Sequence, residues 1–235
     1  MELQQALRTT PATREFTNEP VSDDVVFSIL DDARFAPNGG NRQAWKVIVV
    51  RDGASKQRLG ELWDIGQRED VFHKQQGLVP FVASEAFWRN PPGGPNQPAV
   101  DLDEARRTPI VGFHGANSAV IEHAPVLLVV VLNLTRVMAM DSGLGRLSIS
   151  AGGSVYPFCH NILLAARDRG YGGVITSVLS RQEPAVKALL NIPDEYALAA
   201  VIPLGRPVKE ITKLKRNQVA EFTTRETFDG ARFPA

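Results

Sequence analysis

The chain of 235 residues is 43% hydrophobic and 22% charged, and its 26 basic and 26 acidic side chains leave no net charge. Balanced charge excludes the basic excess of a general nucleic-acid binder. The single cysteine, Cys159, excludes an intramolecular disulfide and a multi-cysteine zinc site. The composition indicates a globular protein with one substantial core or two small ones.

The sequence carries no targeting or membrane pattern. The first residues, 1-MELQQALRTT-10, lack the charged and then apolar order of a signal peptide. The longest apolar run, residues 124–134, is much shorter than the roughly 20 residues that span a bilayer. We therefore expect a cytoplasmic protein that binds neither nucleic acid nor membrane.

Apolar spacing and capping residues predict the elements of the first half of the chain. Ser22 is expected to cap a helix, because the acidic residues Asp23 and Asp24 favour the positive end of a helix. A polar loop, 36-APNGGNRQ-43, then leads directly into a fully apolar strand. In chain order we predict a helix at 3–8, a helix at 25–35, a strand at 45–50 and a helix from 55 to about 66.

Residues 67–113 interrupt this pattern. The segment 90-NPPGGPNQP-98 is a poor former of helix or strand, and aromatic residues flank it. We expect these residues to form an insertion that leaves the core and carries one or two short helices.

The second half resumes the alternation of helices and strands. A capping box, 180-SRQE-183, is expected to open a helix, and the glycines at 170, 172 and 173 to end the one before it. We predict helices at 115–123, 155–169 and 181–190, strands at 125–133 and 197–205, and a polar tail at 206–235. The sum is a single α+β domain over residues 1–235, with a lid-like insertion at about 67–113 and a C-terminal arm at about 206–235.

Three polar clusters lie beside the predicted core elements. They are 8-RTTPATR-14, the loop 36–43, and 213-KLKR-216 on the arm. Arginine suits phosphate, because its fork donates parallel charge-assisted hydrogen bonds. A small phosphorylated ligand gripped between the first and third clusters is one interpretation. The other is that these side chains are simply solvated, as exposed basic residues usually are.

The order of several motifs resembles that of the FMN-dependent nitroreductase family. The residues that carry the resemblance are Arg14, Glu15 and Phe16 after the first helix, 33-ARFAP-37, 41-NRQAW-45, 161-NILLAARDRGYGG-173, 202-IPLGRP-207 and Arg216. The match covers roughly residues 1–60 and 114–220, and the order is more specific than any single motif.

The resemblance implies both a fold and an activity. The fold would be a three-layer α/β sandwich with a central mixed, mainly antiparallel sheet, in a homodimer with extended C-terminal arms and FMN at the subunit interface. The activity would be transfer of hydride from NADPH or NADH through the flavin to a nitroaromatic or quinone acceptor, by a ping-pong mechanism. A flavin-destroying or dehalogenating enzyme of the same fold, and a flavin-binding protein without turnover, remain alternatives.

The resemblance also implies a set of cofactor-binding residues. Arg14 would lie near the polar edge of the isoalloxazine, where positive charge stabilises the reduced flavin. The loop residues would contact FMN from the partner subunit, since glycine allows close approach. The full set is Arg8, Arg14, Asn38, Gly39, Gly40, Asn41, Gln43, Asn117, Thr176, Ser177, Lys213 and Arg216.

Some of these assignments have local alternatives. Asn117 also fits a helix N-cap, and Thr176 and Ser177 also fit an ordinary strand edge. Many relatives carry Arg-Arg-Ser where this chain has Thr10, Pro11 and Ala12. The phosphate contact is therefore expected to shift to Arg8, Thr9 or the arm.

Aromatic residues of the insertion suit a flat, electron-poor substrate. The predicted substrate pocket comprises Phe81, Phe87, Trp88 and Phe113, with Phe72 beside them; the alternative is a small satellite core. No catalytic side chain is expected, because the flavin would carry the chemistry. No metal is expected either, because His73, His114, His123 and His160 lack metal-ligand spacing.

Overall fold

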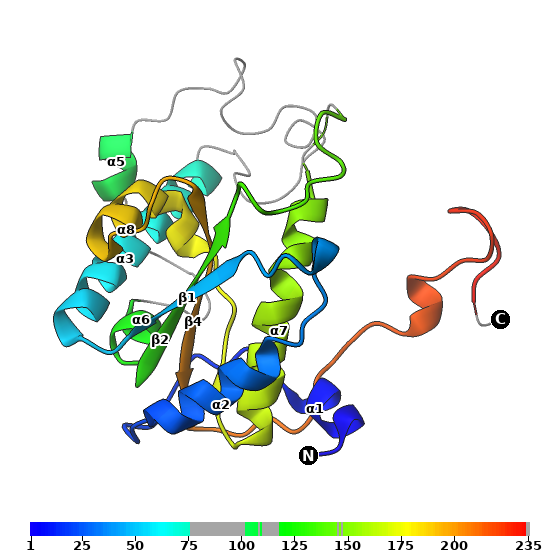
Figure 1. Ribbon diagram of the computed structural model, residues 1–235, viewed down its shortest axis with the longest axis horizontal. Coiled ribbons are helices and arrows are strands. Elements are labelled where there is room, and N and C mark those ends of the chain that lie inside the picture. The colour runs from blue at the N-terminus through cyan, green and yellow to red at the C-terminus, as the bar shows by residue number, and fades with distance from the viewer. Residues whose placement is uncertain (76–101, 108, 110–117, 145, 147, 234–235) are drawn as a thin grey trace.

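The computed structural model describes residues 1–75, 102–107, 109, 118–144, 146 and 148–233 (Figure 1). The predictions for Phe81, Phe87, Trp88, Phe113 and Asn117 lie outside the described residues. The helices are α1 (Leu3–Thr9), α2 (Asp23–Ala33), α3 (Gly53–Gln75), α5 (Leu102–Arg107), α6 (Ala119–Glu122), α7 (Tyr156–Asp168) and α8 (Glu183–Leu190). The strands are β1 (Trp45–Val50), β2 (Val126–Asn133), β3 (Gly172–Gly173) and β4 (Tyr196–Gly205).

The four strands form an antiparallel sheet in the order β1-β2-β4-β3. Strand β2 lies inside the sheet, and every residue from Val126 to Leu132 is buried. This burial on both faces explains the unbroken apolar run in the sequence, because neither side of the strand meets water. The parallel pairing found in the described chain is the isolated bridge between Ala12 and Gly173.

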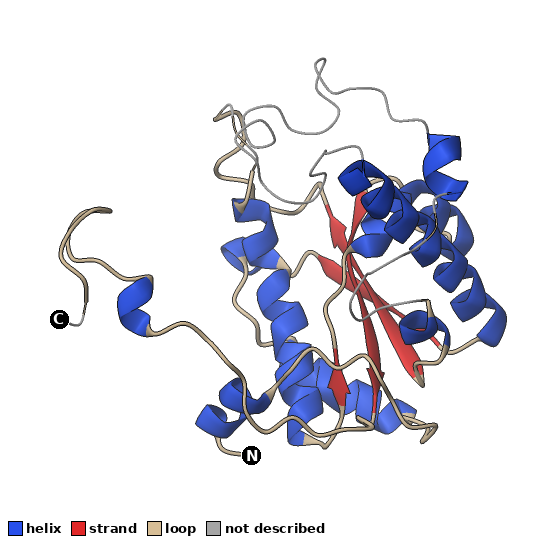
Figure 2. Ribbon diagram, turned by 180° about the vertical axis from the view of Figure 1, so that it is seen from behind, coloured by secondary structure: helices blue, strands red, loops and turns tan. Residues whose placement is uncertain are grey.

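Helices cover both faces of the sheet, as Figure 2 shows. Alternate side chains of β2 enter two separate cores: Leu128 and Val130 pack with α2 and α7, whereas Leu127 and Val129 pack with α3, α6 and α8. This alternation follows from the two-residue period of a strand. The predicted three-layer α+β sandwich is therefore confirmed.

Helix α3 is longer than the sequence predicts. It continues to Gln75 instead of ending near Gly66, so the first residues of the predicted insertion are helical. A Cβ at Gly66 would lie 3.1 Å from the carbonyl oxygen of Val178. The glycine therefore serves close packing and does not end the helix. Phe72 lies on this extension and is buried.

The predicted capping box at residues 180–183 is wrong. Helix α8 begins at Glu183 after a 3-10 turn, and no side chain caps it. The Ser180 hydroxyl donates to the carbonyl oxygen of Leu198 at 3.1 Å, and Glu183 accepts the Leu198 N–H at 2.8 Å. Both side chains therefore bind strand β4, which competes with the local cap.

The described part of the C-terminal arm (residues 206–233) leaves the body beyond α1 in Figures 1 and 2. Among the described residues, the last backbone hydrogen bond from the arm to the body runs from the Val208 N–H to the Glu15 carbonyl oxygen. The apolar side chains of Val219, Phe222 and Phe228 on the arm are exposed. No helix in the part of the chain that the structure describes has the length and hydropathy to cross a membrane.

Candidate functional site

The loop 36–43 has a strained backbone that its own side chains hold. Gly40, Asn41 and Gln43 have φ values of 62°, 50° and 47°, a region that residues other than glycine rarely adopt. The Asn38 side chain accepts the Gln43 N–H at 2.8 Å and donates to the Ala36 carbonyl oxygen at 3.2 Å. Much of the polarity of this loop therefore stabilises the loop itself, and Asn38 acts as its brace.

The loop is anchored at the N-terminal end of α7. The Gly39 N–H donates to the Ser154 hydroxyl at 3.2 Å, and Ser154 lies just before the helix. A Cβ at residue 39 would lie 3.3 Å from both Ser154 and Met138. Glycine thus allows a close approach between the loop and the segment that precedes α7.

The N-terminal cluster lies at the opposite end of α7 (Figure 1). Arg167, in the last turn of the helix, donates to the Thr9 hydroxyl at 3.4 Å, and the Thr13 N–H donates to the Gly173 carbonyl oxygen at 2.9 Å. The 13 residues of α7 span about 20 Å, at about 1.5 Å per residue. One chain therefore holds the loop 36–43 and the N-terminal cluster about 20 Å apart.

The cations that the sequence singles out are exposed and uncommitted. Arg8, Arg14 and Lys213 make no ion pair or hydrogen bond within the described residues. Arg216 donates to the backbone carbonyl oxygen of its neighbour Lys215 at 2.8 Å. These side chains can therefore bind an anion without breaking an existing ion pair.

Thr176 and Ser177 continue from β3 toward β4. The Thr176 N–H donates to the Val201 carbonyl oxygen at 3.0 Å, and the Val201 N–H donates to the Thr176 carbonyl oxygen at 2.8 Å. This pairing is that of an ordinary strand edge, so the backbone N–H of Thr176 is already used. Ser177, next to it, is exposed.

An apolar cleft near the N-terminal end of α7 was not predicted from the sequence. It has a volume of about 580 Å³. Its walls are Leu132, residues 148–149, 151–153 and 155–157, and Ala197–Ala199 of β4. The run 150-SAGGS-154 is the signal that sequence reasoning passed over, because small residues leave room for a ligand or another chain.

Asp141 organises one wall of this cleft. Its carboxylate accepts the Ile149 N–H at 2.8 Å, the Ser148 hydroxyl at 2.7 Å and the Arg146 guanidinium at 2.7 Å, and it also accepts the backbone N–H and hydroxyl of Ser150. These donors hold the pKa of Asp141 well below its usual range, with the Ile149 N–H contributing most.

Neither metal nor thiol chemistry is supported in the part of the chain that the structure describes. No group of three His, Cys, Asp or Glu side chains there is placed to hold a metal ion. Cys159 is buried in the core between α7 and the sheet, and this burial raises the pKa of its thiol to about 12. The thiol therefore stays protonated near neutral pH and is a poor nucleophile.

The fold is an antiparallel sheet between two helical layers. The loop 36–43 and the N-terminal cluster, residues 8–14, lie at opposite ends of helix α7. The same fold is found in the crystal structure of oxidised iodotyrosine deiodinase bound to FMN and 3-iodo-L-tyrosine, with a TM-score of 0.66 and 22% identity over 97% of this chain and all of that one. The chain belongs to the nitroreductase family, whose model matches residues 7–206.

Named relatives cover nearly the whole chain. The chain is 27% identical over 231 residues to nitrobenzene nitroreductase of Ectopseudomonas oleovorans, a match that covers 93% of this chain and 94% of the relative. It is 29% identical over 205 residues to 5,6-dimethylbenzimidazole synthase of Rhodospirillum rubrum, covering 86% and 82%. Together with the family match, these relatives support an oxidoreductase.

Proposed function

We propose that the protein is an FMN-dependent oxidoreductase that takes electrons from NADH or NADPH and passes them to a nitroaromatic or quinone acceptor. One observation carries the proposal: the N-terminal cluster, with Arg8 and Arg14 unpaired among the described residues, and the loop 36–43 lie at opposite ends of α7. A second copy of the chain brings the loop of one subunit to the cationic cluster of the other. Because most oligomers are symmetric dimers, this arrangement yields two equivalent sites.

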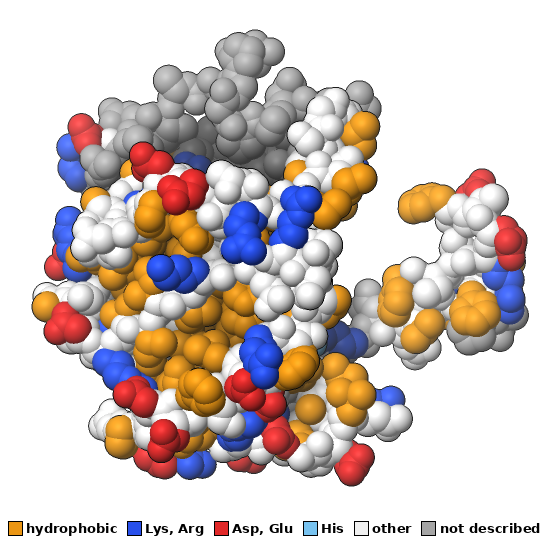
Figure 3. All heavy atoms as spheres, viewed as in Figure 1, with side chains coloured by type: hydrophobic (Ala, Val, Ile, Leu, Met, Phe, Trp, Pro, Cys, Tyr) orange, Lys and Arg blue, Asp and Glu red, His pale blue; other side chains and the backbone are white. Residues whose placement is uncertain are grey.

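The exposed apolar surface supports a homodimer. Strand β1 lies at the edge of the sheet that the described residues form, and Val49 on it is 42% exposed. Figure 3 shows hydrophobic side chains gathered on the face around β1. An uncovered apolar edge promotes association, and the arm of a second copy carries the exposed apolar groups Val219, Phe222 and Phe228. In the proposed dimer, the arms cover apolar surface of the partner.

The residues present fit FMN at such an interface. Arg8, Arg14, Lys213 and Arg216 are free to bind the phosphate and the polar edge of the ring, and Gly39 and Gly40 let the loop backbone approach the ring. When bound, FMN accepts hydride from a nicotinamide and delivers electrons to the acceptor. The chain positions the flavin and its substrates, supplies positive charge and excludes water. No side chain has to act as acid or nucleophile.

A dehalogenating or flavin-consuming enzyme is the second candidate. The likeness to the 5,6-dimethylbenzimidazole synthase and the shared fold with iodotyrosine deiodinase favour it. Both candidates use the same flavin site, so they differ in the final acceptor. Anaerobic reduction by NADH or NADPH, followed by re-oxidation with a nitroaromatic, a quinone, O₂ or an iodophenol, separates the two.

The purified protein is expected to be yellow, with an absorbance maximum near ~450 nm from bound oxidised flavin. The protein, reconstituted with FMN, should oxidise NADH or NADPH and reduce a nitroaromatic or quinone in alternating half-reactions. Steady-state rates with both nicotinamides across a panel of acceptors check this. A protein that stays colourless after incubation with excess FMN would disprove the proposal. Flavin binding without turnover would instead indicate a protein that binds flavin and catalyses no reaction.

A further inference from the structure

Arg167 is a buried arginine without an acidic partner among the described residues. The residue is only 8% exposed, and the one hydrogen bond of its side chain there is the 3.4 Å contact from Nε to the Thr9 hydroxyl. Its neighbour Asp168 is engaged by the amino group of Met1. A buried charge without a counter-ion is costly, so this guanidinium is expected to have a partner that the described residues do not supply.

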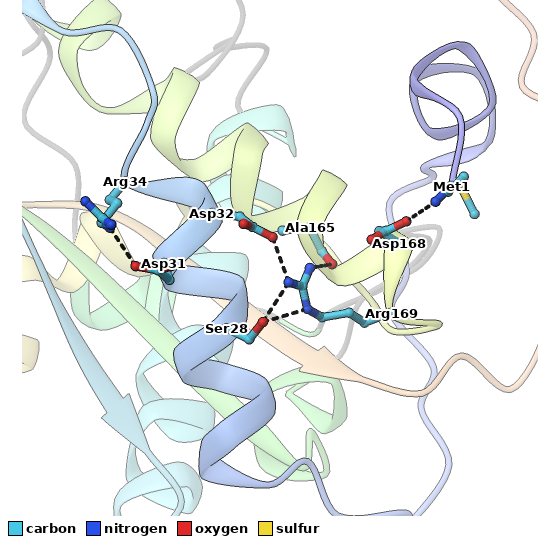
Figure 4. Close-up of polar contacts among 8 residues, drawn as sticks. All are labelled: Met1, Ser28, Asp31, Asp32, Arg34, Ala165, Asp168 and Arg169. Carbon is cyan, nitrogen blue, oxygen red and sulfur yellow. Dashed lines mark hydrogen bonds and ion pairs between the residues drawn. The ribbon is translucent and has the colours of Figure 1, made fainter.

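The nearby Arg169 shows the contrast. It donates to Asp32 at 2.7 Å, to Ser28 at 2.6 Å and to the Ala165 carbonyl oxygen at 2.9 Å. Figure 4 shows this guanidinium turned toward α2, beside the contact between Met1 and Asp168. Arg169 therefore ties α7 to α2, whereas Arg167 keeps unused donors under the N-terminal segment.

Arg167 lines a small crevice between the N-terminal segment and the start of the arm. Its other walls are Thr10, Pro11, Thr13, Tyr171, Gly172, Pro207, Lys209, Glu210 and Ile211. The free volume of about 10 Å³ holds about one water-sized atom. Thr13 is 8% exposed, and its hydroxyl makes no hydrogen bond within the described chain. The remaining guanidinium donors of Arg167 and the unused hydroxyl of Thr13 therefore belong to residues that line the same crevice.

The close packing of this crevice depends on Gly172. A Cβ there would lie 2.6 Å from the Thr13 hydroxyl oxygen. The glycine thus lets β3 come directly against Thr13 and beside the end of α7. The two charged wall residues on the arm, Lys209 and Glu210, are both exposed, so solvent and salt screen the attraction of the one and the repulsion of the other for an anion.

We propose that this crevice is a phosphate subsite, and that the buried Arg167 supplies its charge-assisted contact. One phosphoryl oxygen of FMN takes the water-sized space and accepts from Arg167 and Thr13, and the rest of the phosphate lies at the mouth. The proposal rests on the proposed function, because the anion it names is the FMN phosphate. The charge-assisted contact suits arginine, which donates in a fork.

Comparing FMN with riboflavin isolates the phosphate in a binding experiment. Arg167→Gln is expected to weaken FMN binding about 10- to 100-fold, and to leave riboflavin affinity unchanged. Flavin fluorescence titration at fixed ionic strength measures both dissociation constants. Arg167→Lys should keep part of the affinity, and the control Arg169→Gln should leave the ratio of the two constants at the wild-type value.

Each outcome bears on one claim. Equal loss of FMN and riboflavin affinity, or no loss of either, overturns the phosphate role of Arg167. A wild-type protein that binds no FMN overturns the proposed function instead. If Arg167→Gln does not fold, Thr13→Val carries the test, because it keeps the shape and removes the hydroxyl. This variant should weaken FMN binding several-fold and leave riboflavin affinity unchanged. An unchanged ratio of the two dissociation constants contradicts the subsite.

Discussion

Removing residues 212–235 is expected to convert the protein from a dimer to a monomer and to weaken FMN binding at least about 100-fold. Two charge-assisted contacts from Lys213 and Arg216 are worth about 1.5–3 kcal/mol each, and a loss of about 3 kcal/mol already exceeds 100-fold. The truncation also removes the exposed apolar groups of the arm. Sedimentation velocity and flavin titration measure the two effects.

A double variant separates charge from association. Lys213→Gln with Arg216→Gln should remain dimeric and still lose most of the FMN affinity, because both side chains are exposed and make no contact with another part of the described chain. A truncated protein that is dimeric and binds FMN as tightly as the full chain would show that the arm has neither role.

The second large effect is expected at Asp141. Replacing it with alanine leaves the N–H groups of Ile149 and Ser150 and the hydroxyl of Ser148 without their acceptor. Ser148 and Ile149 line the cleft, and the segment that they begin leads to Ser154, which holds the loop at Gly39. Stability and flavin affinity should therefore both fall. Asp141→Asn should have an intermediate effect, and the exposed control Asp31→Asn almost none.

The effect at Asp141 should depend on pH. The pKa of its carboxyl is lowered in the folded protein, so the ionised group stabilises the fold above the unfolded-state pKa of about 3.9. This stabilisation is lost as the pH falls through the folded-state pKa. Urea unfolding should therefore show the largest difference between wild type and Asp141→Asn near pH ~7 and a smaller one near pH ~3. A difference that is the same at both values would contradict the role of the charge.

The elements of the core could be predicted from local pattern. The strand at 45–50 has the predicted bounds, and the Ser22 hydroxyl accepts the Val25 N–H as a helix N-cap. Hydrophobic runs and caps are local properties, so they can be read without knowing what packs against them. Gly66 and the 180–183 segment were misread because Val178 and Leu198, far along the chain, decide their roles.

The site could be predicted in part for a similar reason. Motif order predicted a role for the loop 36–43 and for the cations, and the structure leaves Arg8, Arg14 and Lys213 exposed and without a partner among the described residues. It did not indicate that Asn38 braces the loop, or that Arg167 is buried without a partner. These properties depend on contacts between segments that are distant in the sequence. The loop 36–43 meets the segment before α7, and the N-terminal segment covers the last turn of α7.

Co-expression of two differently tagged variants tests most directly whether two copies build one flavin site. Asn41→Glu impairs the loop, and Arg14→Glu impairs the N-terminal cluster, so each alone should bind little FMN. Random pairing makes about half of the dimers mixed, each with one intact site, so about a quarter of all sites should bind FMN as in the wild type. A mixture that binds no more FMN than the two variants separately would mean that one chain holds the whole site.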